Sequence, residues 1–91
     1  MSFKVLVLPD LFKNIPPDRE EHIKKALEKL EDPYPGRGDG DKKEIKGAYD
    51  VVYRLRIGDH RAFYRIEKEG SKVYVFDILS AEQAHKKYGR L

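Results

Sequence analysis

The chain has 91 residues, of which 40% are hydrophobic, so we expect a single small domain over residues 1–91 with a modest core. It contains no cysteine, which excludes disulfides and cysteine-based zinc sites and favours an intracellular compartment. A formal net charge of +3 does not by itself predict an anionic partner.

The N-terminal half predicts a strand, a helix and a loop. Residues 3–8, "FKVLVL", have the aliphatic content of a strand, and the run is too short for a signal-peptide core or a membrane span. We therefore expect a soluble, cytoplasmic protein with no membrane partner. Residues 9–15 could form one helical turn before a helix with Pro17 in its first turn. Its apolar positions recur at helical spacing on one stripe: Ile23, Ala26, Leu27 and Leu30.

Residues 32–43 hold two prolines and three glycines and predict a loop. From Ile45 onward the apolar period changes to two, which predicts strands. Gly58-Asp59 supplies a two-residue hairpin turn between "VYRLRI" and "RAFYRI". "KVYVFDIL" predicts a further strand, and Ser80 is a plausible N-cap for a short helix that ends near Gly89.

This order of elements predicts an α+β fold. We expect an antiparallel sheet with the N-terminal helix or helices packed on one face, an open opposite face, and a short C-terminal helix.

A hairpin with Gly58-Asp59 at its tip sorts the neighbouring side chains onto two faces. Opposite the turn, Ile57 faces His60 and Arg56 faces Arg61. The core face then receives Tyr53, Leu55, Ile57, Ala62, Tyr64 and Ile66. The other face receives Arg54, Arg56, Arg61, Phe63 and Arg65.

This second face is strongly basic, in keeping with the distribution of charge along the chain. Residues 1–41 carry 7 Lys/Arg against 9 Asp/Glu, whereas residues 42–91 carry 12 against 7. Like charges opposite each other on a sheet cost about 0.2–1 kcal/mol, so an anionic partner would explain them. Phosphate suits the guanidinium fork, and Phe63 could offer a ring for a base to stack on. Two alternatives remain open: carboxylates elsewhere neutralise the arginines, or the arginine stems merely cover the sheet.

Residues 45–78, "IKGAYDVVYRLRIGDHRAFYRIEKEGSKVYVFDI", resemble the central sheet of the RelE/ParE superfamily of type II toxins. The preceding strand and helix and the chain length also fit that family's compact fold. The resemblance implies a toxin that is restrained by a cognate antitoxin, as a monomer or a toxin-antitoxin hetero-oligomer. RelE-type members cut mRNA in the ribosome through attack of the ribose 2′-OH, which leaves a 2′,3′-cyclic phosphate. ParE-type members inhibit DNA gyrase instead.

The resemblance also implies roles for individual residues. Arg54 and Arg56 fall where RelE-type toxins place basic residues near the scissile phosphate, and Arg61 falls on the arginine that stabilises charge in the transition state. Tyr88 matches the tyrosine regarded as general base or stacking platform. The RNA-binding set that we predict is Lys43, Lys46, Phe63, Arg65, His85, Lys86 and Lys87.

The C-terminal segment departs from the family pattern. An arginine is expected where this chain has Ala81 or Glu82, and its loss at a phosphorane could cost about 3 kcal/mol. The leading prediction is a ribosome-dependent mRNA endonuclease. The alternatives are a ParE-like gyrase inhibitor, a homologue that binds without cutting, and a nucleic-acid-binding domain with no toxin role. The histidines show no metal-ligand spacing, so we predict neither a metal nor a cofactor.

Overall fold

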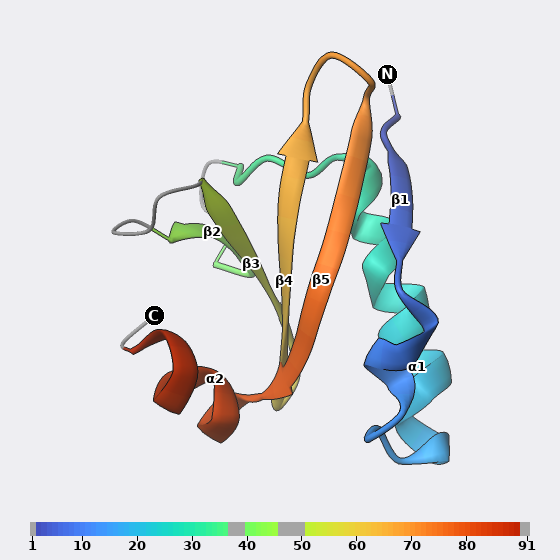
Figure 1. The fold of residues 1–91 in the computed structure, drawn as a ribbon, viewed down its shortest axis with the longest axis vertical. Coiled ribbons are helices and arrows are strands. Elements are labelled where there is room, and N and C mark those ends of the chain that lie inside the picture. Colours follow the sequence, from blue (N-terminus) through green and yellow to red (C-terminus); the bar gives the residue numbers. More distant parts are fainter. Residues whose placement is uncertain (1, 37–39, 46–50, 90–91) are drawn as a thin grey trace.

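The computed structural model describes residues 2–36, 40–45 and 51–89 of the chain. The elements in chain order are β1 (Lys4–Val7), η1 (Pro9–Phe12), α1 (Pro17–Leu27), η2 (Glu28–Glu31), β2 (Lys42–Ile45), β3 (Val52–Ile57), β4 (His60–Glu67), β5 (Lys72–Ser80) and α2 (Ala81–Tyr88). The strands form one sheet in the order β1-β5-β4-β3-β2 (Figure 1). The predicted α+β fold, with an N-terminal helix and a short C-terminal helix, is confirmed.

The sheet is mixed rather than wholly antiparallel. Neighbouring strands from β2 to β5 pair antiparallel, but β1 pairs in parallel with β5 along Lys4↔Lys72 to Val7↔Val75. The prediction of an antiparallel sheet is therefore wrong for β1. β1 is the first strand along the chain, and its neighbour β5 is the last, so a long connection separates the two. Strands that are joined by a long connection can pair in parallel, whereas a tight turn joins only antiparallel strands.

The central hairpin has the predicted register. Ile57 pairs with His60 and Arg56 with Arg61. Gly58 has a φ of +56°, while Asp59 is not among the residues with positive φ. A positive φ at the first central residue alone matches a type II′ turn, whose twist suits antiparallel strands. This turn fixes which side chains share a face.

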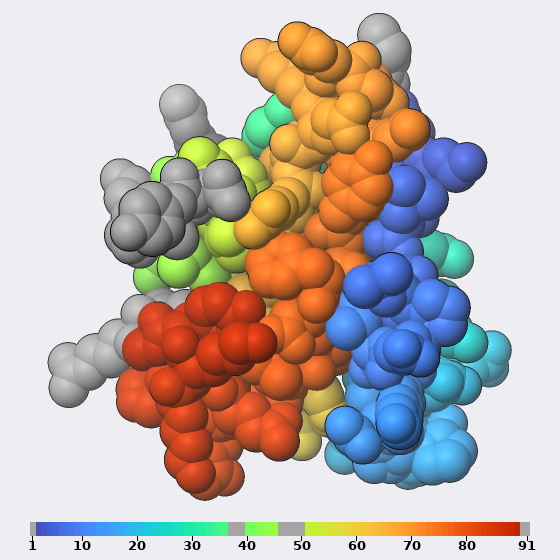
Figure 2. Space-filling model, viewed as in Figure 1, coloured from blue at the N-terminus to red at the C-terminus, as the bar shows by residue number. Residues whose placement is uncertain are grey.

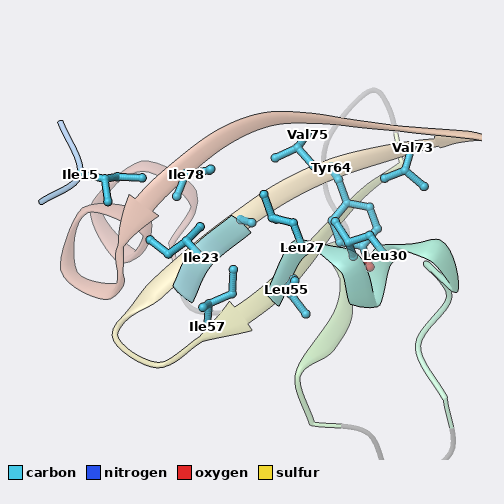
Figure 3. Packing of buried hydrophobic residues seen from close by; sticks show 11 residues of the cluster. Ile15, Ile23, Leu27, Leu30, Leu55, Ile57, Tyr64, Val73, Val75 and Ile78 are labelled. Atoms are coloured by element: carbon cyan, nitrogen blue, oxygen red, sulfur yellow. The ribbon is translucent and has the colours of Figure 1, made fainter. Parts of the chain in front are cut away.

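Helix α1 and the turn η2 cover one face of the sheet and close the main core (Figure 3). The predicted stripe supplies Ile23, Leu27 and Leu30, all buried, whereas Ala26 is half-buried. They pack against the buried sheet residues Leu55, Ile57, Ala62, Tyr64, Val73, Val75 and Ile78. The Tyr64 hydroxyl donates to the Pro33 carbonyl at 2.6 Å, which satisfies the one polar atom of this buried ring.

The opposite face is not fully open, in contrast to the prediction. Helix α2 lies across one end of it, as the red segment in Figure 2 shows, and closes a second small core.

The predicted loop over residues 32–43 is too long, because β2 begins at Lys42 and pairs with β3. Within the described residues, no helix has both the length and the apolarity that crossing a membrane requires.

Candidate nucleic-acid interface

One row of side chains crosses four strands on the face that α2 partly covers. Lys43 of β2 pairs with Arg54 of β3, Arg54 with Phe63 of β4, and Phe63 with Asp77 of β5. Cross-strand partners lie on the same face of a sheet, so the row brings two cations, an aromatic ring and a carboxylate side by side.

Helix α2 is anchored to this row by its cap and by a ring stack. The Ser80 hydroxyl accepts the Gln83 backbone N–H at 3.1 Å, and the Gln83 side chain accepts the Ser80 backbone N–H at 3.2 Å. This capping box confirms the predicted start of the helix. The last residue of α2, Tyr88, stacks on Phe63 with ring centroids 4.1 Å apart and an interplanar angle of 26°.

The stack overturns the predicted role of Phe63. Its side chain is 0% exposed, so it cannot offer a face to an RNA base. Tyr88 covers it and is itself half-buried. Of the two stacked rings, Tyr88 is therefore the one that retains exposure to solvent. The error arose because the sheet pattern places Phe63 on the correct face but says nothing of the helix that lies on it.

Asp77 is a member of this cluster that the sequence analysis missed. Its Oδ2 accepts hydrogen bonds from Lys87 Nζ at 2.7 Å and from the Tyr88 hydroxyl at 3.1 Å. Burial, followed by the charge of Asp77, raises the pKa of the Tyr88 phenol. The hydrogen bond to Asp77 likewise raises the pKa of Lys87. Both donors are thus held in their protonated forms, and a tyrosinate at Tyr88 is disfavoured.

A second cluster is formed by three arginines of the hairpin. Arg54 is 8% exposed, its Nη2 donates to the Gly40 carbonyl at 3.2 Å, and its Nε is buried without a hydrogen-bond partner among the described residues. Burial, followed by the charges of Arg61 and Arg56, lowers the pKa of the Arg54 guanidinium. The guanidinium groups of Arg61 and Arg56 are thus close enough to repel that of Arg54. An anion placed among them would relieve this repulsion.

Only one of these arginines donates to a carboxylate among the described residues. Arg56 Nε and Nη2 lie 3.3 and 3.2 Å from Asp41 Oδ1, so the alternative in which an acidic residue neutralises the face holds for Arg56. Arg61 Nη1 instead donates to the carbonyls of Gly58 and His60, at 2.8 and 2.9 Å. A backbone carbonyl carries no net charge, so the cluster remains cationic.

The other predicted RNA-binding residues lie in several places. Arg65 is exposed and pairs across the strands with Tyr74, and its guanidinium lies 5.3 Å from the centre of the Phe76 ring. Lys43 is exposed beside Arg54 in the row. On α2, His85 is exposed and Lys86 forms a 3.6 Å ion pair with Glu82. Lys46 lies outside the described residues. In the described part of the chain, no group of three or more histidine or acidic side chains could hold a metal ion.

Comparisons with known proteins identify the family. A sequence model of the family described as the ParE toxin of the type II toxin-antitoxin system parDE matches residues 8–85. No curated protein matches the chain. Among solved structures, the archaeal RelE–RelB complex from Pyrococcus horikoshii has a similar fold, with a TM-score of 0.67 at 20% identity, over 88% of this chain and 96% of that one.

Two further structures have a similar fold at a similarly low sequence identity. The toxin-antitoxin complex RelBE2 from Mycobacterium tuberculosis gives a TM-score of 0.65 at 19% identity, over 88% of this chain and 99% of that one. A mutant of the E. coli toxin RelE in the free state gives 0.63 at 19% identity, over 93% and 90%. Since the family match spans most of the chain and the fold agrees with it, the protein is a type II toxin of the RelE/ParE superfamily.

Proposed function

We propose that this toxin is a ribosome-dependent mRNA endonuclease that stops translation. The observation that carries the proposal is the cluster of Arg54, Arg56 and Arg61, in which Arg54 Nε is buried with no partner among the described residues. Attack of a ribose 2′-OH on the adjacent phosphate builds negative charge on the phosphorane oxygens. Guanidinium groups stay protonated at every working pH and can stabilise that charge.

The two clusters suggest how the substrate would lie. The phosphate would approach the arginines, and the half-buried Tyr88 at the end of α2 could stack on a neighbouring base. Lys43 and Lys87 would contact the RNA backbone on either side, and Lys46 stays a predicted RNA contact. Arg65, His85 and Lys86 would act only as outer, electrostatic contacts.

The partner that restrains the activity would be a cognate antitoxin, with which the toxin forms a hetero-oligomer. Two of the solved structures of similar fold are named as complexes of a RelE-type toxin with its antitoxin. Because the proposed target is the ribosome, we expect the toxin to act in the cytoplasm.

A second candidate function is binding without cleavage, with DNA gyrase as the target. Two observations favour it: the matching family model is described as ParE, and α2 begins with Ala81 and Glu82, where RelE-type toxins are expected to carry an arginine. In that case the arginine cluster would bind a macromolecule and no RNA bond would break.

The deciding experiment is in vitro translation of a defined mRNA with purified toxin, with new RNA ends mapped by primer extension. We expect cuts within codons that require ribosomes and carry 2′,3′-cyclic phosphates. Arg61→Ala should abolish the cuts, whereas Arg19→Ala, an exposed arginine of α1, should leave them unchanged. An intact message together with inhibition of gyrase supercoiling would overturn the proposal in favour of the second candidate.

A further inference from the structure

The geometry points to Asp77 as a positioning residue that accepts the proton of Tyr88 during RNA cleavage. This inference rests on the proposed endonuclease function and gives the Tyr88 hydroxyl the contact with the ribose, in addition to the stacking of the Tyr88 ring on a base. Asp77 itself would not touch the substrate and would act through the phenol.

The contacts of Asp77 fix both the carboxylate and the ring. Its side chain is 15% exposed, and one oxygen, Oδ2, receives both the Tyr88 hydroxyl and Lys87 Nζ. Tyr88 is held from the other side by its stack on Phe63, the cross-strand partner of Asp77. Ring and carboxylate therefore keep one relative orientation, with the phenolic hydrogen directed at Oδ2. The phenolic oxygen also interacts with the Lys87 side chain, which leaves one lone pair to accept a further hydrogen bond.

This arrangement resolves a chemical difficulty in the role of Tyr88. A general base must take the proton of the 2′-OH, yet Tyr88 is a donor that keeps its own proton. A phenol can accept a proton on oxygen only if it gives one up in the same step. Asp77 Oδ2, at 3.1 Å, is the acceptor in place for that second transfer.

The balanced step has two linked proton transfers and one displacement at phosphorus. The O2′–H bond breaks as a new phenolic O–H bond forms, and the original phenolic proton moves to Oδ2 of Asp77. O2′ forms a bond to phosphorus and the bond from phosphorus to the 5′ oxygen breaks. The leaving oxygen takes a proton from water, Asp77 later returns its proton to water, and Tyr88 ends the cycle unchanged.

Several charged and titratable groups face Asp77. Lys87 and Tyr88 come from α2. His60 of β4 and Asp10 of η1 line, together with Asp77, a small polar cavity of about 210 Å³. The relay requires a carboxylate oxygen at Asp77 Oδ2 as the proton acceptor, so replacement of this carboxylate should slow cleavage.

The test compares single-turnover cleavage of ribosome-bound mRNA as a function of pH. Asp77→Asn should slow cleavage about 100-fold at neutral pH without loss of ribosome binding. Its rate should then rise with pH, because only ionised Tyr88 remains as a base. Asp77→Glu should restore part of the rate, and the double variant with Tyr88→Phe should be no slower than Tyr88→Phe alone.

A matched control is a tyrosine–carboxylate pair elsewhere on the same sheet. The Tyr74 hydroxyl donates to Glu67 Oε2 at 2.9 Å, so Glu67→Gln removes an equivalent charge away from the site and should leave rate and pH profile unchanged. Asp77→Asn with a wild-type rate and pH profile would overturn the inference. So would a Lys87→Met variant that reproduces the loss while Tyr88→Phe remains active, because Asp77 would then act only by docking α2.

An independent readout separates this inference from the proposed function. Ultraviolet titration of tyrosine ionisation, with Tyr88→Phe as reference, should show a lower pKa for Tyr88 in the Asp77→Asn variant. A wild-type toxin that makes no cuts, but whose Tyr88 shows this shift, would overturn the endonuclease proposal and leave the hydrogen bond established. If the wild type cuts mRNA but the pKa of Tyr88 is the same in the Asp77→Asn variant, the relay alone is overturned.

Discussion

Phe63 and Tyr88 form a stacked pair, 4.1 Å between ring centroids, that joins the last residue of α2 to the centre of the sheet. The pair belongs to a small core, separate from the main one, that also contains the buried residues Val52 and Ala84. The aromatic pair itself contributes about 0.5–1.5 kcal/mol beyond the area that it buries. The position of Tyr88 at the proposed site therefore depends on a residue of β4.

Truncation of Phe63 should destabilise the fold and displace Tyr88 together. We expect Phe63→Ala to lower the free energy of unfolding by about 3–5 kcal/mol, because it leaves a cavity where the ring is fully buried. Phe63→Leu should cost less, since it fills most of the volume. Urea denaturation gives both values, and a cost below about 1 kcal/mol for Phe63→Ala would contradict the burial of this ring.

We expect Arg54 to be required for function although its burial lowers the free energy of unfolding. Its guanidinium is buried, one nitrogen has no partner among the described residues, and burial and neighbouring arginines lower its pKa. A lowered pKa of a base means that the folded state binds the proton less tightly than the unfolded state, which is a cost at neutral pH. Arg54→Met should therefore leave the free energy of unfolding unchanged or raise it by about 1 kcal/mol or more.

The same Arg54→Met variant should lose mRNA cleavage. Thermal denaturation and primer extension on one preparation check both effects. A variant that is both less stable by several kcal/mol and fully active would contradict this account of Arg54.

The hairpin illustrates how much of the site the sequence could predict. A two-residue turn and a period of two leave a single register, so the pairing of Arg56 with Arg61 follows from the chain alone. The helix stripe and the Ser80 cap depend on equally local rules.

Asp77 shows where such reasoning fails. Phe63 pairs with Asp77 but Tyr64 pairs with Val75, so Phe76 is an extra residue, a bulge, in β5. Strict alternation from Val73 and Val75 would place Asp77 in the main core, and the bulge turns it to the face of α2 instead. The burial of Phe63 and the parallel partner of β1 were missed for a related reason. Both depend on contacts between segments that are distant in sequence.

Alkaline pH should destabilise the protein through Tyr88 and Lys87. Burial and then Asp77 raise the pKa of Tyr88 above its usual 10.0, and the bond to Asp77 raises that of Lys87 above 10.5. A group with a raised pKa in the folded state contributes stability that is complete below its unfolded pKa and is lost as pH rises through the folded value. The free energy of unfolding should therefore be flat near neutral pH and fall above about pH 10.

Urea denaturation across this range would measure the effect. Tyr88→Phe should show a shallower fall than the wild type, because the phenyl ring keeps the stack on Phe63 and cannot ionise. An equal slope in both proteins would show that other groups cause the alkaline loss.

Asp41 should weaken the binding of RNA by competing with its phosphates. Its Oδ1 accepts from Arg56 Nε and Nη2, and its carbonyl accepts the Arg56 backbone N–H at 2.7 Å. The carboxylate thus occupies the guanidinium donors that a phosphate oxygen would otherwise use. Asp41→Asn removes the charge but keeps the backbone contact. Both partners of the ion pair are about half exposed, so the change in unfolding free energy should stay within about 1 kcal/mol.

The gain should appear in RNA affinity. We expect Asp41→Asn to bind a single-stranded RNA oligonucleotide about fivefold more tightly, with a steeper dependence on salt, because one more cation is free to meet a phosphate. Fluorescence anisotropy at several salt concentrations measures both. The combination with Arg56→Ala serves as control and should abolish the gain. Unchanged affinity and salt slope in Asp41→Asn would mean that Arg56 is not part of the RNA-binding surface, and the phosphate would then depend on Arg54 and Arg61.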